Sequence, residues 1–103
     1  MTAAGDPASA APPTGPIRRR ATVVNQRGLH ARPAAKFAKL AQGFDADVRV
    51  AAKGENVSAL SIMGLMMLGA GPGTELEITA TGNDAAAAAA ALAAFIDNSF
   101  DES

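Results

Sequence analysis

Residues 75–81 read Glu-Leu-Glu-Ile-Thr-Ala-Thr, and apolar and polar side chains alternate along the whole stretch. A period of two predicts a β-strand with one buried and one solvated face. Directly after it, Gly82-Asn83-Asp84 ends the strand and caps the next element, and seven consecutive alanines over residues 85–91 favour a helix. A strand with one polar face beside a separate helix is typical of an antiparallel sheet that helices cover on one side.

Outward from this strand, changes of hydrophobic period divide the rest of the chain into further elements. The predicted strands cover Arg20–Asn25, Ala46–Val50 and a short segment at Val57 and Ala59 that follows a turn at Lys53-Gly54. The predicted helices cover Ala31–Gly43, Ile62–Leu68 and a last helix with a buried stripe of Leu92, Phe95, Ile96 and Phe100. The order is βαββαβα, an α+β fold, and Arg18-Arg19-Arg20 is interpreted as a solvated entrance to the first strand.

The length of 103 residues allows one small domain. Residues 1–16 are rich in alanine and proline and have no hydrophobic periodicity, which predicts a disordered tail before a folded domain over residues 17–103. No apolar run approaches the ~20 residues of a membrane-spanning helix, and the N-terminus lacks the pattern of a signal peptide. We therefore expect a cytoplasmic protein without membrane insertion.

The composition argues against several function classes. A net charge of −1 gives no field that would attract nucleic acid. There is no cysteine and His30 is the single histidine, so thiol chemistry is excluded and no metal or cofactor is expected. A hydrolase needs a base and an orienting acid beside its nucleophile, and no motif links a carboxylate to His30. A small-ligand-binding regulatory domain needs a convergent set of polar residues, of which the sequence gives no sign apart from His30.

The stretch Gly28-Leu29-His30-Ala31-Arg32-Pro33-Ala34 carries the candidate chemistry, because His30 stands where a loop meets a helix. The first N–H groups of a helix lack intrahelical acceptors and favour an anion such as phosphate. Arg32 in the first turn can bind the same anion through charge-assisted hydrogen bonds, and Arg27 and Ala31 are further phosphate-binding candidates. A neutral imidazole nitrogen is a competent nucleophile near pH 7. The competing interpretation is a solvated or capping histidine with a solvent-facing arginine.

These seven residues resemble the active-site motif of HPr, the histidine phosphocarrier of the bacterial phosphoenolpyruvate-dependent phosphotransferase system. The segment Ser61–Gly69 resembles the regulatory-serine segment of the same family at the expected spacing, and the likeness covers about residues 17–103. The resemblance implies an open-faced β-sandwich, in which three helices cover one face of a four-stranded antiparallel sheet. It also implies a monomer.

The resemblance further implies a relay and not a stand-alone enzyme. Enzyme I, charged by phosphoenolpyruvate, would phosphorylate His30 on Nδ1, Arg32 would stabilise the phosphoryl group, and a IIA-type protein would receive it. The segment Gln42–Val48 and the ending Ser99–Glu102 resemble the nitrogen-related NPr branch of the family, whereas the Ser61 segment resembles HPr proteins that meet a kinase. A regulatory or nitrogen-related phosphorelay is the resulting interpretation.

Ser61 is the candidate regulatory residue, and its alternative role is a plain helix N-cap. An HPr kinase/phosphorylase is a candidate partner, although Leu60 stands where many relatives have lysine. Most of the apolar residues after Ser61 are expected in the core, with Ile62, Met63 and Met66 exposed as partner contacts. The alternative function is a regulatory binding protein controlled by phosphorylation of Ser61.

Overall fold

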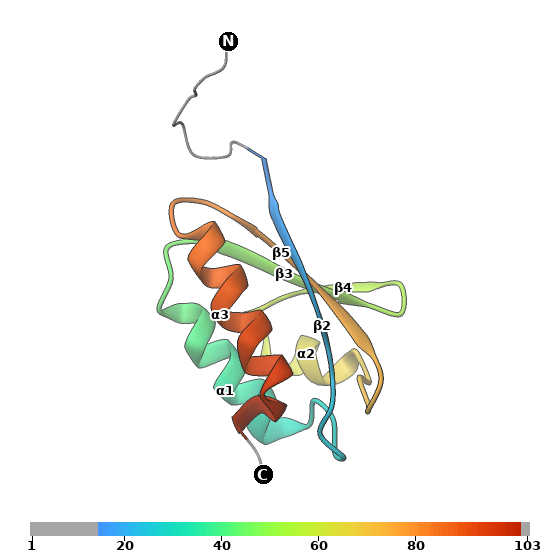
Figure 1. Cartoon of the computed structure of the whole chain (residues 1–103). Helices are drawn as coiled ribbons and strands as arrows, with labels where there is room; N and C mark the ends of the chain where they lie inside the picture. Colours follow the sequence, from blue (N-terminus) through green and yellow to red (C-terminus); the bar gives the residue numbers. More distant parts are fainter. Residues whose placement is uncertain (1–14, 102–103) are drawn as a thin grey trace.

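Four antiparallel strands form one sheet in the order β2-β5-β3-β4 in the computed structural model, which describes residues 15–101. The strands are β2 (Ile17–Thr22), β3 (Asp47–Ala52), β4 (Glu55–Ser58) and β5 (Glu75–Thr81). The helices are α1 (Ala31–Gln42), α2 (Ile62–Met67) and α3 (Ala85–Asp97), followed by a short 3-10 turn, η2 (Ser99–Asp101). Figure 1 shows α1 and α3 side by side against one face of the sheet. The predicted α+β class and βαββαβα order are confirmed.

The alternation along β5 determines which face of the sheet the helices cover. Leu76, Ile78 and Ala80 are buried, whereas Glu75 and Thr81 are exposed on the opposite face. The buried residues pack with apolar side chains from α1, α3 and the neighbouring strands. The largest fully buried members of this core are Phe37, Phe100, Leu65, Leu76, Ile78, Leu92, Ile96, Val23 and Val50.

The first strand begins and ends earlier than its sequence predicts. It covers Ile17–Thr22, and Arg18, Arg19 and Arg20 are exposed residues within it rather than an entrance to it. An edge strand tolerates this run because its outer side chains stay in water and its charges discourage pairing with another chain. Val23 still exchanges backbone hydrogen bonds with Thr74 and Gly73 after the strand has ended.

The end of the last helix also differs from the expected pattern. Phe100 is fully buried as expected, but α3 ends at Asp97 and Phe100 lies in η2 with a φ of 53°. Its ring meets that of Phe95 edge-on at a centroid distance of 5.6 Å, so the turn folds the aromatic ring back onto the core. Phe95 itself is half-buried, because it lies on the side of the predicted stripe nearest solvent.

The tail predicted over residues 1–16 lies outside the described residues, apart from Gly15 and Pro16 just before β2. Within the described part, no helix combines the length and the apolar character that crossing a bilayer requires.

Candidate functional site

The loop before α1 is closed by hydrogen bonds that fix the approach to His30. The buried Asn25 donates from Nδ2 to the carbonyl oxygen of Gly28 at 2.9 Å, and the Gly28 N–H donates to the Asn25 carbonyl oxygen at 3.2 Å. The next residue, Leu29, donates its N–H to the Ala70 carbonyl oxygen at 2.9 Å. This bond ties the loop to the segment after α2, so two distant parts of the chain determine where His30 stands.

His30 is the N-cap residue of α1. Its backbone is extended, its carbonyl oxygen accepts the Ala34 N–H at 3.0 Å, and its side chain forms no capping hydrogen bond. The side chain is half-buried. The N–H groups of Ala31 and Arg32 belong to the first turn and have no intrahelical acceptor, and Pro33 has no N–H to satisfy. An anion beside His30 would therefore meet the positive end of the helix.

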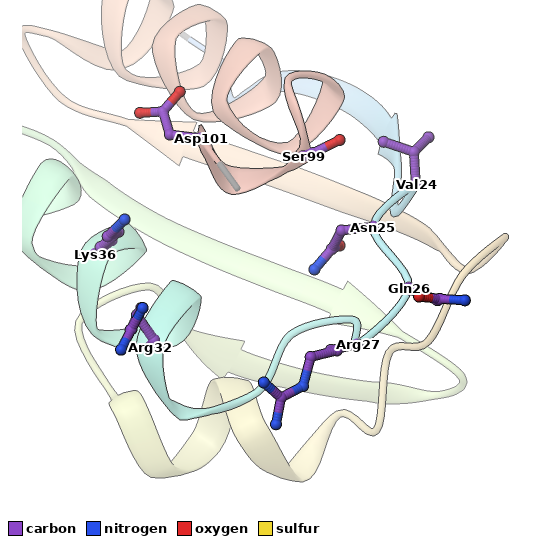
Figure 2. Close-up of a pocket in the computed structure, with 8 residues that line it drawn as sticks. All are labelled: Val24, Asn25, Gln26, Arg27, Arg32, Lys36, Ser99 and Asp101. Atoms are coloured by element: carbon purple, nitrogen blue, oxygen red, sulfur yellow. The ribbon is translucent and has the colours of Figure 1, made fainter. Parts of the chain in front are cut away.

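The structure brings Arg27 and Arg32 together across an open depression of about 670 Å³, where Lys36 joins them (Figure 2). His30 lies between the two arginines in sequence but does not line this depression. Lys36 was missed at the sequence level, although its spacing of four from Arg32 places both side chains on one face of α1. The result is a cationic surface next to the imidazole.

Ser61 caps the second helix. Its Oγ accepts the Gly64 N–H at 3.0 Å, and the residue is exposed at the start of α2. The N-cap role predicted for it is confirmed by this bond.

Replacing Ser61 by alanine is expected to lower the free energy of unfolding by about 1 kcal/mol, because the Gly64 N–H loses its partner. Urea denaturation of the full chain measures this change. Ser61→Asp keeps a capping oxygen and is the matched control, with a loss of a few tenths of a kcal/mol at most. Equal stability of Ser61→Ala and the wild type would contradict a structural role of the cap.

The apolar run of α2 is mostly exposed, not mostly core. Leu65 and Leu68 are buried, whereas Ile62, Met63 and Met66 are exposed, Met63 by 72% of its surface. Met67 was missed, although it is 76% exposed. A helix of six residues has one face against the core, so its other apolar side chains are left in water. Leu60, just before the helix, extends this apolar surface.

A family model described as "PTS HPr component phosphorylation site" matches residues 17–98. The chain belongs to the HPr family. The chain is 41% identical over 87 residues to "Phosphocarrier protein NPr" of Shewanella violacea. This match covers 84% of this chain and 96% of that protein. The chain is 43% identical over 86 residues to "Phosphocarrier protein HPr" of Cupriavidus necator, with coverage of 84% and 97%.

Solved HPr structures share the fold. The crystal structure of HPr from Thermoanaerobacter tengcongensis superposes with a TM-score of 0.79 at 37% identity and covers 84% of this chain and 98% of that one. HPr from Bacillus anthracis gives a TM-score of 0.75 at 43% identity, with coverage of 79% and 96%. The HPr resemblance read from the Gly28–Ala34 and Ser61–Gly69 segments is thereby confirmed. Over residues 15–101, no group of three or more histidine and acidic side chains is arranged to hold a metal ion.

Proposed function

We propose that this phosphocarrier accepts a phosphoryl group from Enzyme I on His30 and donates it to a IIA-type protein. The observation that carries the proposal is the position of His30 at the N-cap of α1, with Arg27 and Arg32 close to it in the sequence, in a chain of the HPr family. The protein acts as a relay in this proposal, as a monomer in the cytoplasm, and turns over no small substrate alone.

The proposed transfer needs a neutral nitrogen of His30, Nδ1 by the family resemblance. Its lone pair attacks phosphorus and a nitrogen–phosphorus bond forms, while the bond from phosphorus to the donor atom of Enzyme I breaks and leaves its electron pair on that atom. In the second step, a nucleophile of the IIA-type protein displaces the nitrogen, which recovers its lone pair. No oxidant or further reactant enters.

Arg32 is the proposed stabiliser of the phosphoryl group, with Arg27 and the first-turn N–H of Ala31 as further donors. Oxygen atoms of a transferring phosphoryl group carry the negative charge, and fixed cations and N–H groups stabilise it without reorganisation at the moment of transfer. The guanidinium can donate two parallel hydrogen bonds to one phosphate, which a point charge cannot do.

Replacing Arg32 by alanine is expected to slow phosphoryl acceptance about 10- to 100-fold, because a hydrogen bond to a charged group is lost. Single-turnover transfer from phosphorylated Enzyme I measures the rate. Arg19→Ala is the matched control: it removes the same charge from an exposed position on β2 and is expected to change the rate less than twofold. Similar slowing in both variants would contradict a local role for Arg32.

The exposed side chains Ile62, Met63 and Met66 are the proposed contacts for Enzyme I and the IIA-type protein. They form an apolar surface on α2 beside the loop that precedes α1, because Leu29 is bonded to Ala70 just after α2. Exposed apolar patches mark protein interaction sites, and flexible methionine side chains suit a surface that meets more than one partner.

The proposal is tested by following labelled phosphoenolpyruvate through purified Enzyme I to this chain and then to a IIA-type protein. Both a sugar-branch and a nitrogen-branch Enzyme I are used, because we place the protein in a regulatory or nitrogen-related relay. Acid-labile label on the chain that moves to the IIA-type protein supports the carrier function. Failure of both Enzyme I types to label the chain would overturn it.

A second candidate function is a regulatory binding protein controlled by phosphorylation of Ser61, with an HPr kinase/phosphorylase as partner. The exposed Ser61 hydroxyl beside the apolar surface of α2 favours it. A phosphate there adds a charge of about −1.5 to −2 next to Ile62 and Met63, which would change what this surface binds. In this case Ser61→Ala in cells would abolish the regulatory effect of the protein, whereas His30→Ala would leave that effect intact.

A further inference from the structure

The depression beside α1 is built by three parts of the chain that are distant in sequence (Figure 2). Gln26 and Arg27 come from the loop after β2, Arg32 and Lys36 from α1, and Ser99 and Asp101 from η2. Its volume of about 670 Å³ falls within the range of pockets that hold small molecules. Because His30 is not among its lining residues, the depression extends beyond the proposed site of phosphoryl transfer.

The lining carries a local excess of positive charge on a chain whose net charge is −1. Among the described residues of the lining, three cations, Arg27, Arg32 and Lys36, face one carboxylate, Asp101, which leaves an excess of two positive charges within residues 15–101. Within residues 15–101, an ion pair joins Arg20 to Glu77 on the sheet. None of the three cations of the depression forms an ion pair with a carboxylate of these described residues. A cleft of one charge sign concentrates ligands of the opposite sign.

The wall opposite α1 is held in a conformation that side chains rarely adopt. Ser99, Phe100 and Asp101 have φ values of 57°, 53° and 58°, in the left-handed region that L-residues disfavour. Phe100 anchors the turn in the core, and the Asn98 side chain donates to Asp101 Oδ1 at 3.1 Å. Strained turns of this kind cluster at functional sites. Here the burial of Phe100 and the hydrogen bond from Asn98 offset the strain and hold a hydroxyl and a carboxylate at the depression.

We propose that the depression binds a phosphate monoester of a small polyhydroxylated molecule, of the sugar-phosphate class. A phosphate monoester carries about −1.5 to −2 charges at pH 7, which matches the excess of positive charge. Arg27, Arg32 and Lys36 bind the phosphate. The Asp101 carboxylate accepts hydrogen bonds from hydroxyl groups and repels a second anionic group, which disfavours a bisphosphate. Ser99, from the same turn as Asp101, adds a polar contact to the hydroxyl end.

This binding is non-covalent, involves the unphosphorylated chain and goes beyond the proposed transfer. Since Arg32 belongs to both sites, a bound phosphate monoester would compete for the guanidinium that the incoming phosphoryl group needs. To the extent that the bound ester makes phosphorylation of His30 less favourable at equilibrium, linkage requires that phosphorylated His30 weaken the binding of the small molecule by the same factor.

Glucose 6-phosphate is the test probe, titrated into the full chain and followed by calorimetry and by amide shifts in ¹⁵N-resolved NMR spectra, with no transfer partner present. We expect saturable shifts at Ser99, Asp101 and Arg27, affinity at least tenfold higher than for inorganic phosphate, and no measurable binding of glucose. Lys36→Met is expected to weaken binding about tenfold or more. Lys39→Met removes the same charge one turn along α1, outside the depression, and is expected to change affinity less than twofold.

Asp101→Asn tests the hydroxyl end of the pocket. Asparagine tolerates the left-handed backbone and keeps the oxygen that accepts from Asn98, so the turn is retained. We expect it to tighten inorganic phosphate and to reduce the preference for glucose 6-phosphate. Absence of localised shifts, equal affinity for inorganic phosphate and glucose 6-phosphate in the wild type, or equal weakening by Lys36→Met and Lys39→Met would each overturn the proposal. Because Enzyme I takes no part, failure here leaves the proposed transfer function unaffected.

Discussion

His30→Ala is expected to accept no acid-labile label from phosphoenolpyruvate and Enzyme I, a loss of activity to the background of the assay. The reason is chemical: His30 is the single histidine of the chain, and an imidazole is the side chain whose nucleophilic nitrogen is neutral near pH 7, whereas lysine and arginine are protonated and the amides are not nucleophilic. The substitution lies at a half-buried N-cap and removes no side-chain capping hydrogen bond, and a stability check of this variant is part of the experiment. Circular dichroism and urea denaturation provide this check.

Ser61→Ala is the control for this experiment, since it removes the other candidate acceptor. It is expected to take up acid-labile label at a rate within about twofold of the wild type, because its hydroxyl bonds to Gly64 in the second helix and not to the His30 loop. Acid-stable label on the wild type that disappears in Ser61→Ala and persists in His30→Ala would reject the carrier function. It would favour the regulatory binding protein instead.

Much of the fold could be predicted from the sequence, because one side of each regular element is buried. The alternation over residues 75–81 identified β5 with its bounds, and Leu76, Ile78 and Ala80 are the side chains that reach the core. Likewise, Pro33 and the apolar positions after it identified α1. These elements can be recognised in the sequence because the buried positions of a strand or a helix recur at a fixed spacing.

The boundaries of β2 and the cationic depression could not be predicted in the same way. An exposed edge strand such as residues 17–22 needs no apolar alternation, so its three arginines obscured it. Lys36 and Asp101 belong to elements separated by most of the chain, and only the packing of α1 against η2 brings them to one surface. The positive φ angles of Ser99, Phe100 and Asp101 could not be predicted either, because none of these residues is a glycine.

Gly28 shows how closely the loop before His30 depends on distant backbone. Its φ is +65°, and a Cβ atom at this position would overlap the carbonyl oxygen of Ala70, which accepts the Leu29 N–H. The obstructing oxygen belongs to the backbone, so it cannot move away by a change of rotamer as a side-chain atom could. The loop or the segment after α2 must therefore shift if any side chain is introduced.

Gly28→Ala is accordingly expected to lower the free energy of unfolding by about 3 kcal/mol, combining left-handed strain with overpacking. Gly69→Ala is the matched control: its φ is +62° and a methyl group at this position would meet nothing within 4 Å, so it should lose only the ~1–2 kcal/mol of strain. Urea denaturation gives both values, and the difference between them isolates the contact with Ala70. Because the displaced loop carries His30, label uptake by Gly28→Ala should also be slower than by Gly69→Ala. Equal destabilisation of the two variants would mean that the loop relaxes freely, and that the bond from Leu29 to Ala70 does not determine where the histidine stands.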